Sequence, residues 1–231
     1  MKNIEQTNSK ILESLNNNGY ALLDKVLNEE ECKSFVAMYD DSTRFRKTIS
    51  MERYRFGAGE YKYFTYPLPD IIQQLREKLY LILYPIANTW FKVLNMDFQF
   101  PDTHKAFIKM CSAHNQTFAT PLILKYGEGG HNTLHQDLYG EIYFPLQAVI
   151  FLNQPDEDYT GGEFIMIEQI PRAQSKAIVL QPNRGDILIF TTQFRPRKGT
   201  KGYYRVNMKH GVSEVHSGER HTLGIIFHDA K

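Results

Sequence analysis

Two cysteines in 231 residues are too few for a disulfide framework, and Cys32 and Cys111 form no CxxC pair of the kind that binds zinc. No apolar run approaches the roughly 18 residues that a membrane-spanning helix needs. Segment 1–15 carries charges throughout and lacks the apolar stretch of a secretory signal. Repeats, low-complexity tracts and Ser/Gly-rich linkers are absent as well. These absences predict a cytoplasmic protein without a membrane segment.

The composition is that of a packed globular protein, with 42% hydrophobic and 13% aromatic residues and a formal net charge of +1. Apolar residues at helical spacing dominate residues 1–100, and a long helix is expected over 69–95, kinked or divided by Pro85. Segment 43–63 is basic and has little apolar periodicity, which indicates a mobile loop.

Residues 101–231 have a different texture. Short apolar stretches recur there, separated by Gly, Pro, Asn and Asp, a pattern typical of a β-sandwich or barrel. We therefore predict an α+β protein, a single compact unit in which N-terminal helices (1–100) pack on a β-rich body (101–231).

His135 and Asp137 lie two residues apart in LHQDLYG (134–140). In an extended chain such residues project to the same face, so an imidazole and a carboxylate here can bind one metal ion. Two histidines and one carboxylate leave positions open on the metal, as in non-haem Fe(II) oxygenases. His210, in the strand-like VNMKHGVSEV, is the favoured third ligand. A lone His-x-Asp pair is usually incidental, so the prediction depends on that third residue.

Two other histidines compete for the third position. His216 lies in an expected turn, and His221 should face away from Arg220 because strand residues alternate. The remaining histidines are more simply interpreted as structural or surface residues: His104, His114, His131 and His228.

Arg220 follows His210 by ten residues, across an expected hairpin that turns at Gly218. Its guanidinium offers a planar pair of donors to a carboxylate. Thr222 would share the same face of the strand and add a hydroxyl. Together they predict a site for a carboxylate near the metal.

These motifs carry a family resemblance. LHQD with KHGVSEVHSGERHT resembles the Fe(II)- and 2-oxoglutarate-dependent dioxygenases, whose pattern is His-x-Asp, a distal His and then Arg-x-Ser/Thr. The resemblance implies a double-stranded β-helix core (jelly roll, cupin-like). It implies Fe(II) on His135, Asp137 and His210, with 2-oxoglutarate and O2 as cosubstrates. It also implies that Arg220 and Thr222 bind the far carboxylate of 2-oxoglutarate.

Two branches of that superfamily are represented. The ten-residue step to Arg220 and YTGGEF resemble prolyl hydroxylases, whereas LKYGEGGHNTLHQD resembles alkylated-nucleic-acid repair dioxygenases. The second likeness implies that Tyr126 helps to hold 2-oxoglutarate. The chain as a whole is similar to a little-characterised group of bacterial oxygenases proposed to act on nucleic acids.

Two basic segments bear on the substrate. Segment 43–63 has six Lys/Arg, two acids and five aromatics, and segment 194–210 has six Lys/Arg, no acids and three aromatics. Cations for phosphates and aromatics for bases are typical of a single-stranded nucleic-acid groove. Tyr139, Arg197 and Arg205 are the predicted substrate contacts.

Three alternatives stay open. The basic segments are equally consistent with solvated loops whose aromatics belong to the core. A peptide or amino-acid hydroxylase, prolyl hydroxylase included, could use Arg197, Lys198 or Arg205 for a substrate carboxylate. A non-catalytic, cupin-type ligand sensor would belong to another class, although intact ligands argue against it. The sequence does not indicate an oligomeric state.

Overall fold

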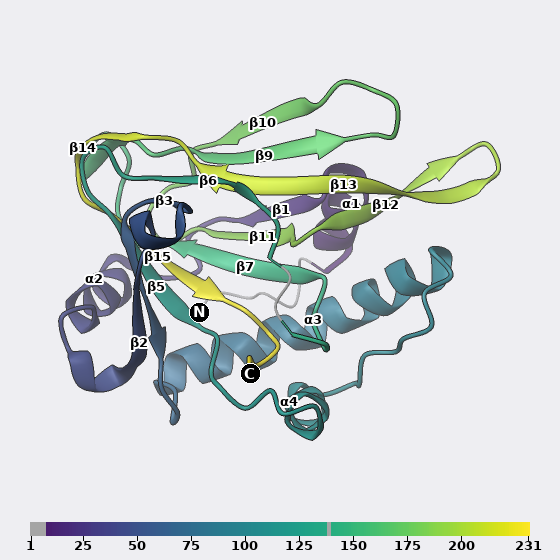
Figure 1. Cartoon of the computed structure of the whole chain (residues 1–231), viewed down its shortest axis with the longest axis horizontal. Coiled ribbons are helices and arrows are strands. Elements are labelled where there is room, and N and C mark those ends of the chain that lie inside the picture. Colours follow the sequence, from purple (N-terminus) through teal and green to yellow (C-terminus); the bar gives the residue numbers. More distant parts are fainter. Residues whose placement is uncertain (1–7, 138–139) are drawn as a thin grey trace.

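The computed structural model describes residues 8–137 and 140–231, which form helices packed on two antiparallel sheets (Figure 1). The helices and 3-10 turns are α1 Asn8–Asn18, α2 Glu29–Met38, η2 Ser42–Arg44, η3 Glu52–Tyr54, α3 Asp70–Val93 and α4 His104–Ala113. The strands are β1 Tyr20–Leu23, β2 Phe45–Ser50, β3 Gly57–Ala58, β4 Glu60–Phe64, β5 Leu122–Tyr126, β6 His131–His135, β7 Leu146–Phe151, β8 Tyr159–Gly161, β9 Phe164–Gln169, β10 Lys176–Leu180, β11 Ile187–Thr191, β12 Phe194–Gly199, β13 Gly202–Val212, β14 Val215–Gly218 and β15 Arg220–Ile225.

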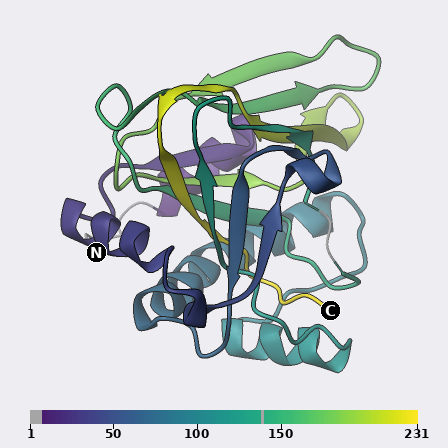
Figure 2. The same ribbon diagram turned by 60° about the vertical axis from the view of Figure 1, so that its left-hand side comes forward.

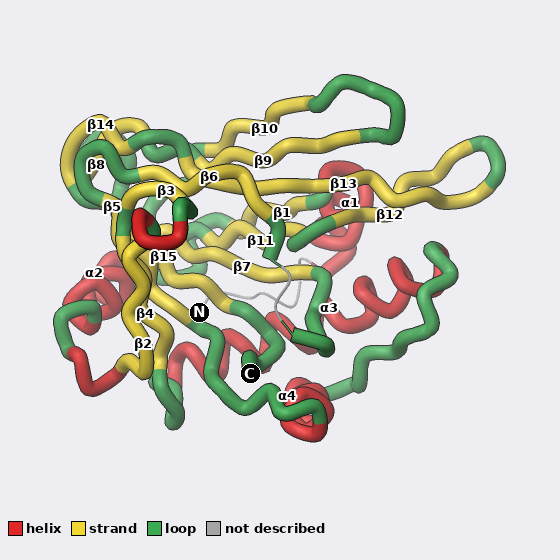
Figure 3. Tube along the Cα trace, viewed as in Figure 1, coloured by secondary structure: helices red, strands yellow, loops and turns green. Residues whose placement is uncertain are grey.

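The larger sheet has seven strands in the order β1-β11-β7-β15-β5-β4-β2. The smaller sheet runs β10-β9-β13-β6-β3, with β12 paired to β13, while β8 and β14 form a separate pair (Figure 3). The early strands β1, β2 and β4 thus join the same sheet as the late strands β11 and β15. Residues 1–100 therefore supply part of the sheet as well as helices.

The central strands of the larger sheet, β7, β11 and β15, are buried along their whole length. The smaller sheet lies over one face of this sheet and helix α3 lies under the other (Figure 2). Leu188 packs against Met208 and its neighbours from the smaller sheet, whereas Ile187 belongs to the core that contains Leu79 of α3. Since successive strand residues point to opposite faces, a sheet covered on both sides requires the continuous apolar run DILIF.

Helix α3 continues through Pro85, so the expected division there does not occur. Proline removes one N–H, which leaves the carbonyl of Leu81 without its helical partner. The Leu81 side chain is 51% exposed, on the solvent side of the helix where water can reach that carbonyl. None of the described helices, α3 included, is both long and apolar enough to span a membrane.

The loop expected over 43–63 is wrong, because most of this segment is strand. β2 and β4 pair antiparallel, and β4 also pairs with β5. β2 forms the outer edge of the larger sheet, a position where charged residues discourage pairing with other chains. In β4 the aromatics Tyr61 and Tyr63 alternate with polar residues, a period of two that a search for helical spacing overlooks.

Stability is expected to decrease as pH falls from 6.5 toward 5, because three histidines other than the predicted metal ligands are buried. Burial lowers the pKa of His104 to about 3 and those of His221 and His228 to about 4, from an ordinary value of 6.5. Below pH 6.5 the unfolded chain therefore binds protons that the folded chain excludes. The free energy of unfolding should fall by about 1.4 kcal/mol per pH unit for each histidine. Urea unfolding at several pH values measures this slope.

His104→Asn should remove one histidine's share of that slope. A free energy of unfolding that stays constant between pH 6.5 and 5 would contradict the prediction.

Candidate active site

Three predicted metal ligands meet in space. His135 ends β6 and lies directly opposite His210 on β13, while Asp137 follows just beyond the strand. The Asp137 carboxylate lies 3.5 Å from His135 Nε2 through one oxygen and 3.2 Å from His210 Nε2 through the other. One ligand atom from each residue lies within 4.8 Å of the other two, so the cluster can hold a single metal ion.

Neighbouring groups orient both imidazoles. His135 Nδ1 lies 2.7 Å from the carbonyl of Thr133, and donation to that oxygen leaves Nε2 free to bind a metal. The His210 ring is stacked on Phe164, with centroids 5.9 Å apart, and meets Phe190 edge-on at 4.7 Å. These contacts fix the two rings before any ligand arrives.

The cluster is charged as a metal site requires. Burial raises the pKa of Asp137, but His210 and His135 outweigh this and hold it well below its ordinary value. Burial also opposes protonation of His135, yet the carboxylate of Asp137 raises its pKa overall. Asp137 is therefore ionised at neutral pH, and a cation bound in the cluster would compete with protonation of the histidines.

A cavity of about 300 Å³ adjoins the cluster, and Tyr126, Arg220 and Thr222 all line it. Arg220 is 1% exposed, yet its guanidinium forms no ion pair and no hydrogen bond of good geometry with any described residue, although it lies near enough to the Tyr159 hydroxyl to counteract the rise that burial causes in the pKa of that group. Instead it lies among the rings of Tyr126, Phe151 and Tyr159, at 5.5, 5.4 and 6.0 Å. A buried, unpaired cation is costly, so this arrangement favours an anionic ligand in the cavity.

Tyr126 and Thr222 can complete a carboxylate site. Tyr126 lies opposite Arg220 across β5 and β15, and Thr222 shares the face of Arg220 toward the cavity. Burial raises the pKa of Tyr126 to about 12, so its phenol keeps the proton that it would donate. The prediction that these three residues come together agrees with their placement.

The hairpin expected between His210 and Arg220 is wrong. β13 belongs to the smaller sheet and β15 to the larger, and β14, between them, pairs with β8. His210 and Arg220 therefore reach the cavity from opposite sheets, which places the metal and the carboxylate site at different points of one enclosed space.

The rival histidines lie elsewhere. His221 faces Tyr39, with ring centroids 5.6 Å apart, and its backbone N–H donates to Asn153 Oδ1. His216 is exposed on β14. Within residues 8–137 and 140–231, the His135–Asp137–His210 cluster is the one group with metal-binding geometry.

The predicted substrate contacts are not gathered at this cavity. Tyr139 lies outside the described residues. Arg197 lines a separate groove, 3.5 Å from Glu168 Oε1. Arg205 is exposed, with its guanidinium 5.0 Å from the centre of the Phe194 ring. Neither arginine is among the described residues that line the metal cavity, and their role in substrate binding stays a prediction.

Residues 59–230 match the model of the Oxygenase-NA family, described as an oxygenase catalysing oxidative methylation of damaged DNA. The chain belongs to this family. Two relatives, uncharacterized proteins from two strains of Mycobacterium tuberculosis, are each 43% identical over 193 residues, covering 82% of this chain and 83% of theirs.

Solved structures share the fold of this Oxygenase-NA protein. A Pseudomonas putida prolyl-4-hydroxylase is 14% identical with a TM-score of 0.59, covering 94% of this chain and 97% of its own. A Trichoplax adhaerens prolyl hydroxylase is 14% identical with a TM-score of 0.55, covering 96% and 89%. A Burkholderia pseudomallei oxidoreductase of the 2OG-Fe(II) oxygenase family is 13% identical with a TM-score of 0.55, covering 100% and 96%. Family and metal cluster together make the chain a 2-oxoglutarate- and Fe(II)-dependent oxygenase, an oxidoreductase.

The residues that form the outer wall of the metal cavity were not identified from the sequence. Met51, Phe56, Tyr61 and Tyr63 line it, all from the segment expected to be a loop. The alternation of Tyr61 and Tyr63 was the signal that could have found them. Gln147 on β7 was also missed, because one glutamine in a buried strand has no distinctive pattern.

Gln147 is expected to hold Asp137 in place for the metal. Its Nε2 donates to Asp137 Oδ2 at 2.6 Å and lies 3.4 Å from His210 Nε2. Gln147→Leu removes this donor, and Fe(II) affinity should fall about 10–100-fold, the usual effect of losing a residue that orients a ligand. Anaerobic Fe(II) titration measures it. Gln74→Leu, at an exposed position of α3 outside the cavity, is the matched control, and wild-type affinity in Gln147→Leu would contradict the role.

Proposed function

We propose that this oxygenase oxidises a modified base in nucleic acid, most simply a methylated base from which the methyl group is removed. The cofactor is Fe(II), and 2-oxoglutarate and O2 are the cosubstrates. We further propose that the two facing sheets form a double-stranded β-helix, the jelly-roll core of that superfamily.

The observation that carries the proposal is the unpaired guanidinium of Arg220 inside the metal cavity. A dicarboxylate that binds the metal at one end would place its far carboxylate against Arg220, with Thr222 and Tyr126 as further donors. The buried cation then gains the partner that it lacks within the described chain. A sensor that had lost catalysis would have no need to keep both this residue and three metal ligands.

Each residue has a defined task in the proposed reaction. His135, Asp137 and His210 would hold Fe(II), and Arg220 would orient 2-oxoglutarate. When bound, the metal supplies the oxidative decarboxylation of 2-oxoglutarate to succinate and CO2, which places one oxygen atom of O2 in succinate and the other on a substrate carbon. The apolar wall limits the access of water to the reacting centre. The protein's contribution is thus placement and enclosure.

Two observations favour a nucleic-acid base as substrate. The family description names damaged DNA. The cavity, at about 300 Å³, lies at the lower end of the size range for ligand sites and must also admit 2-oxoglutarate, so a small flat group suits the remaining space. A base extruded from its strand is such a group.

A peptide or amino-acid hydroxylase is the alternative substrate class. It is suggested by the prolyl hydroxylases of similar fold, but at 14% identity that likeness carries fold rather than substrate. The experiment below therefore includes peptides.

The test measures succinate formed from 2-oxoglutarate in the presence of methylated oligonucleotides or of Pro-, Arg- or Lys-containing peptides. We expect methylated oligonucleotides to stimulate succinate formation, with release of formaldehyde in equal amount, and unmethylated ones to leave it at the basal rate. Stimulation by peptides alone would eliminate the nucleic-acid proposal while leaving the oxygenase intact.

A further inference from the structure

An exposed aromatic pair borders the metal cavity. Tyr54 and Phe56 are 52% and 46% exposed, and their rings are stacked with centroids 5.5 Å apart and planes inclined by 17°. Phe56 also lines the cavity that contains the metal cluster. Exposed aromatic surface therefore extends from solvent to the mouth of the active site. Large exposed aromatic side chains usually mark a binding surface.

The backbone of this aromatic pair is hydrogen-bonded to β6, the strand that carries His135. The carbonyl of Phe56 accepts hydrogen bonds from both the N–H and the hydroxyl of Thr133 on β6, each at 2.8 Å. β3 then pairs with β6 at Gly57, where an added Cβ would come within 2.2 Å of the His131 carbonyl oxygen. The close approach requires glycine there, and it ties the position of the aromatic pair to that of the metal ligand.

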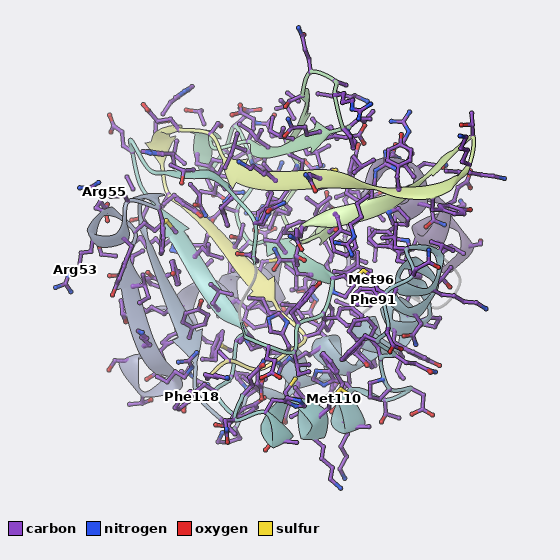
Figure 4. All side chains as sticks on the ribbon, turned by 45° about the vertical axis from the view of Figure 1, so that its right-hand side comes forward. Arg53, Arg55, Phe91, Met96, Met110 and Phe118 are labelled. Carbon is purple, nitrogen blue, oxygen red and sulfur yellow. The ribbon has the colours of Figure 1, made fainter. Side chains whose placement is uncertain are left out.

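Two cations flank the aromatic pair. Arg53 and Arg55 are exposed, and within the described part of the chain neither side chain forms an ion pair or a hydrogen bond. Figure 4 shows both side chains projecting outward from the same edge of the molecule. The nearby acid, Glu52, is already occupied, because it accepts hydrogen bonds from Ser50 Oγ and the N–H of Gly59. The surface is therefore net positive as well as aromatic.

We infer that these four residues, Arg53–Phe56, which we call the aromatic rim, bind a single-stranded segment of nucleic acid beside the base that enters the cavity. The inference rests on the proposed function and adds the strand state and the residues that recognise it. Tyr54 and Phe56 stack on a neighbouring base, and Arg53 and Arg55 contact its phosphates. A duplex hides its base faces, so stacking on the rim requires an unpaired strand.

The other basic segment, 194–210, is less suited to binding nucleic acid beside the cavity. Arg195 is buried and bonded to Glu168 at 2.5 Å and to the carbonyl of Asn16, and Arg197 also lies near Glu168. Arg197 lines a groove that shares none of the residues around the metal cavity. Arg195 and Arg197 are thus partly neutralised, and neither lines the metal cavity.

The test is equilibrium binding of a fluorescent single-stranded DNA of mixed sequence, and of its duplex, to protein loaded with Fe(II) and 2-oxoglutarate without O2. The single strand should bind more tightly than the duplex. Tyr54→Leu should weaken binding of the single strand about tenfold, with an unchanged salt dependence. Arg53→Gln with Arg55→Asn should lower the slope of log affinity against log salt by about 1.4, since each phosphate contact on a single strand contributes about 0.7.

The matched control removes two charges elsewhere. Arg55 has a left-handed φ of 59° and Arg172, at a distant turn, has one of 64°, and asparagine tolerates that conformation in both places. Arg172→Asn with Lys201→Gln should leave the slope at the wild-type value. An equal loss in this control, or equal affinity for duplex, overturns the inference.

The visible absorption of the Fe(II)–2-oxoglutarate complex, recorded for each protein, distinguishes two kinds of failure. If the wild type lacks this band, the proposed function fails, and the inference fails with it. If the band and succinate formation are present but the rim variants bind the single strand like wild type, only the inference is overturned.

Discussion

Replacing Asp137 with alanine is expected to abolish both succinate formation and the visible absorption of the Fe(II)–2-oxoglutarate complex. Asp137 is the one anionic residue of the metal cluster, and it lies within 3.5 Å of both histidine nitrogens. Since its pKa is held below the ordinary value, it supplies a full negative charge at neutral pH. Two neutral imidazoles alone hold a divalent cation weakly, so metal and cosubstrate binding should be lost together.

Asp137→Asn keeps the size of the side chain but removes its negative charge, and should be as inactive as the alanine variant. Asp102→Asn, an exposed residue outside the cavity, is the matched control and should retain wild-type turnover. If Asp137→Ala still coupled 2-oxoglutarate decarboxylation to product formation, the metal assignment would be wrong.

Local spacing was sufficient to predict which residues of the site share a face. Along β15, Arg220 and Thr222 line the cavity while His221 points away, as a period of two requires. The step from His135 to Asp137 likewise brings both to one ion. Such predictions succeed because the direction of a strand side chain depends only on its own backbone.

Pairing between distant strands could not be predicted in the same way. The turn around Gly218 suggested a hairpin, but β14 pairs with β8, and this sends β15 into the other sheet. The wall formed by Tyr61 and Tyr63 depends on β4 pairing with β5. Strand partners are decided by burial across the whole core, which a local pattern does not contain.

The sequence also could not distinguish a buried arginine with a structural role from one that binds a ligand. Replacing each kind of arginine should change the free energy of unfolding by a very different amount. Arg76 is fully buried on α3, where Asp229 lies 2.7 Å from its Nη2. Its Nε donates to the Ile226 carbonyl and its Nη1 to the Tyr66 hydroxyl. Nη2 also contacts Thr120 and the backbone carbonyls of 227 and 228. Arg76→Met would leave the buried carboxylate of Asp229 without its cation. The free energy of unfolding should fall by about 3–5 kcal/mol, measured by urea denaturation.

Arg220→Met makes the same chemical change at a cation with no ion-pair partner in the described chain, and should leave the free energy of unfolding unchanged or raise it. Adding 2-oxoglutarate with Fe(II), in the absence of O2, should make the wild type more stable relative to Arg220→Met. At about 100 times its Kd the ligand should stabilise wild type by about 2.7 kcal/mol, whereas Arg220→Met should gain little because the far carboxylate has lost its partner. Equal stabilisation of both proteins would remove Arg220 from the cosubstrate site, and a large loss of stability without ligand would make it structural, like Arg76.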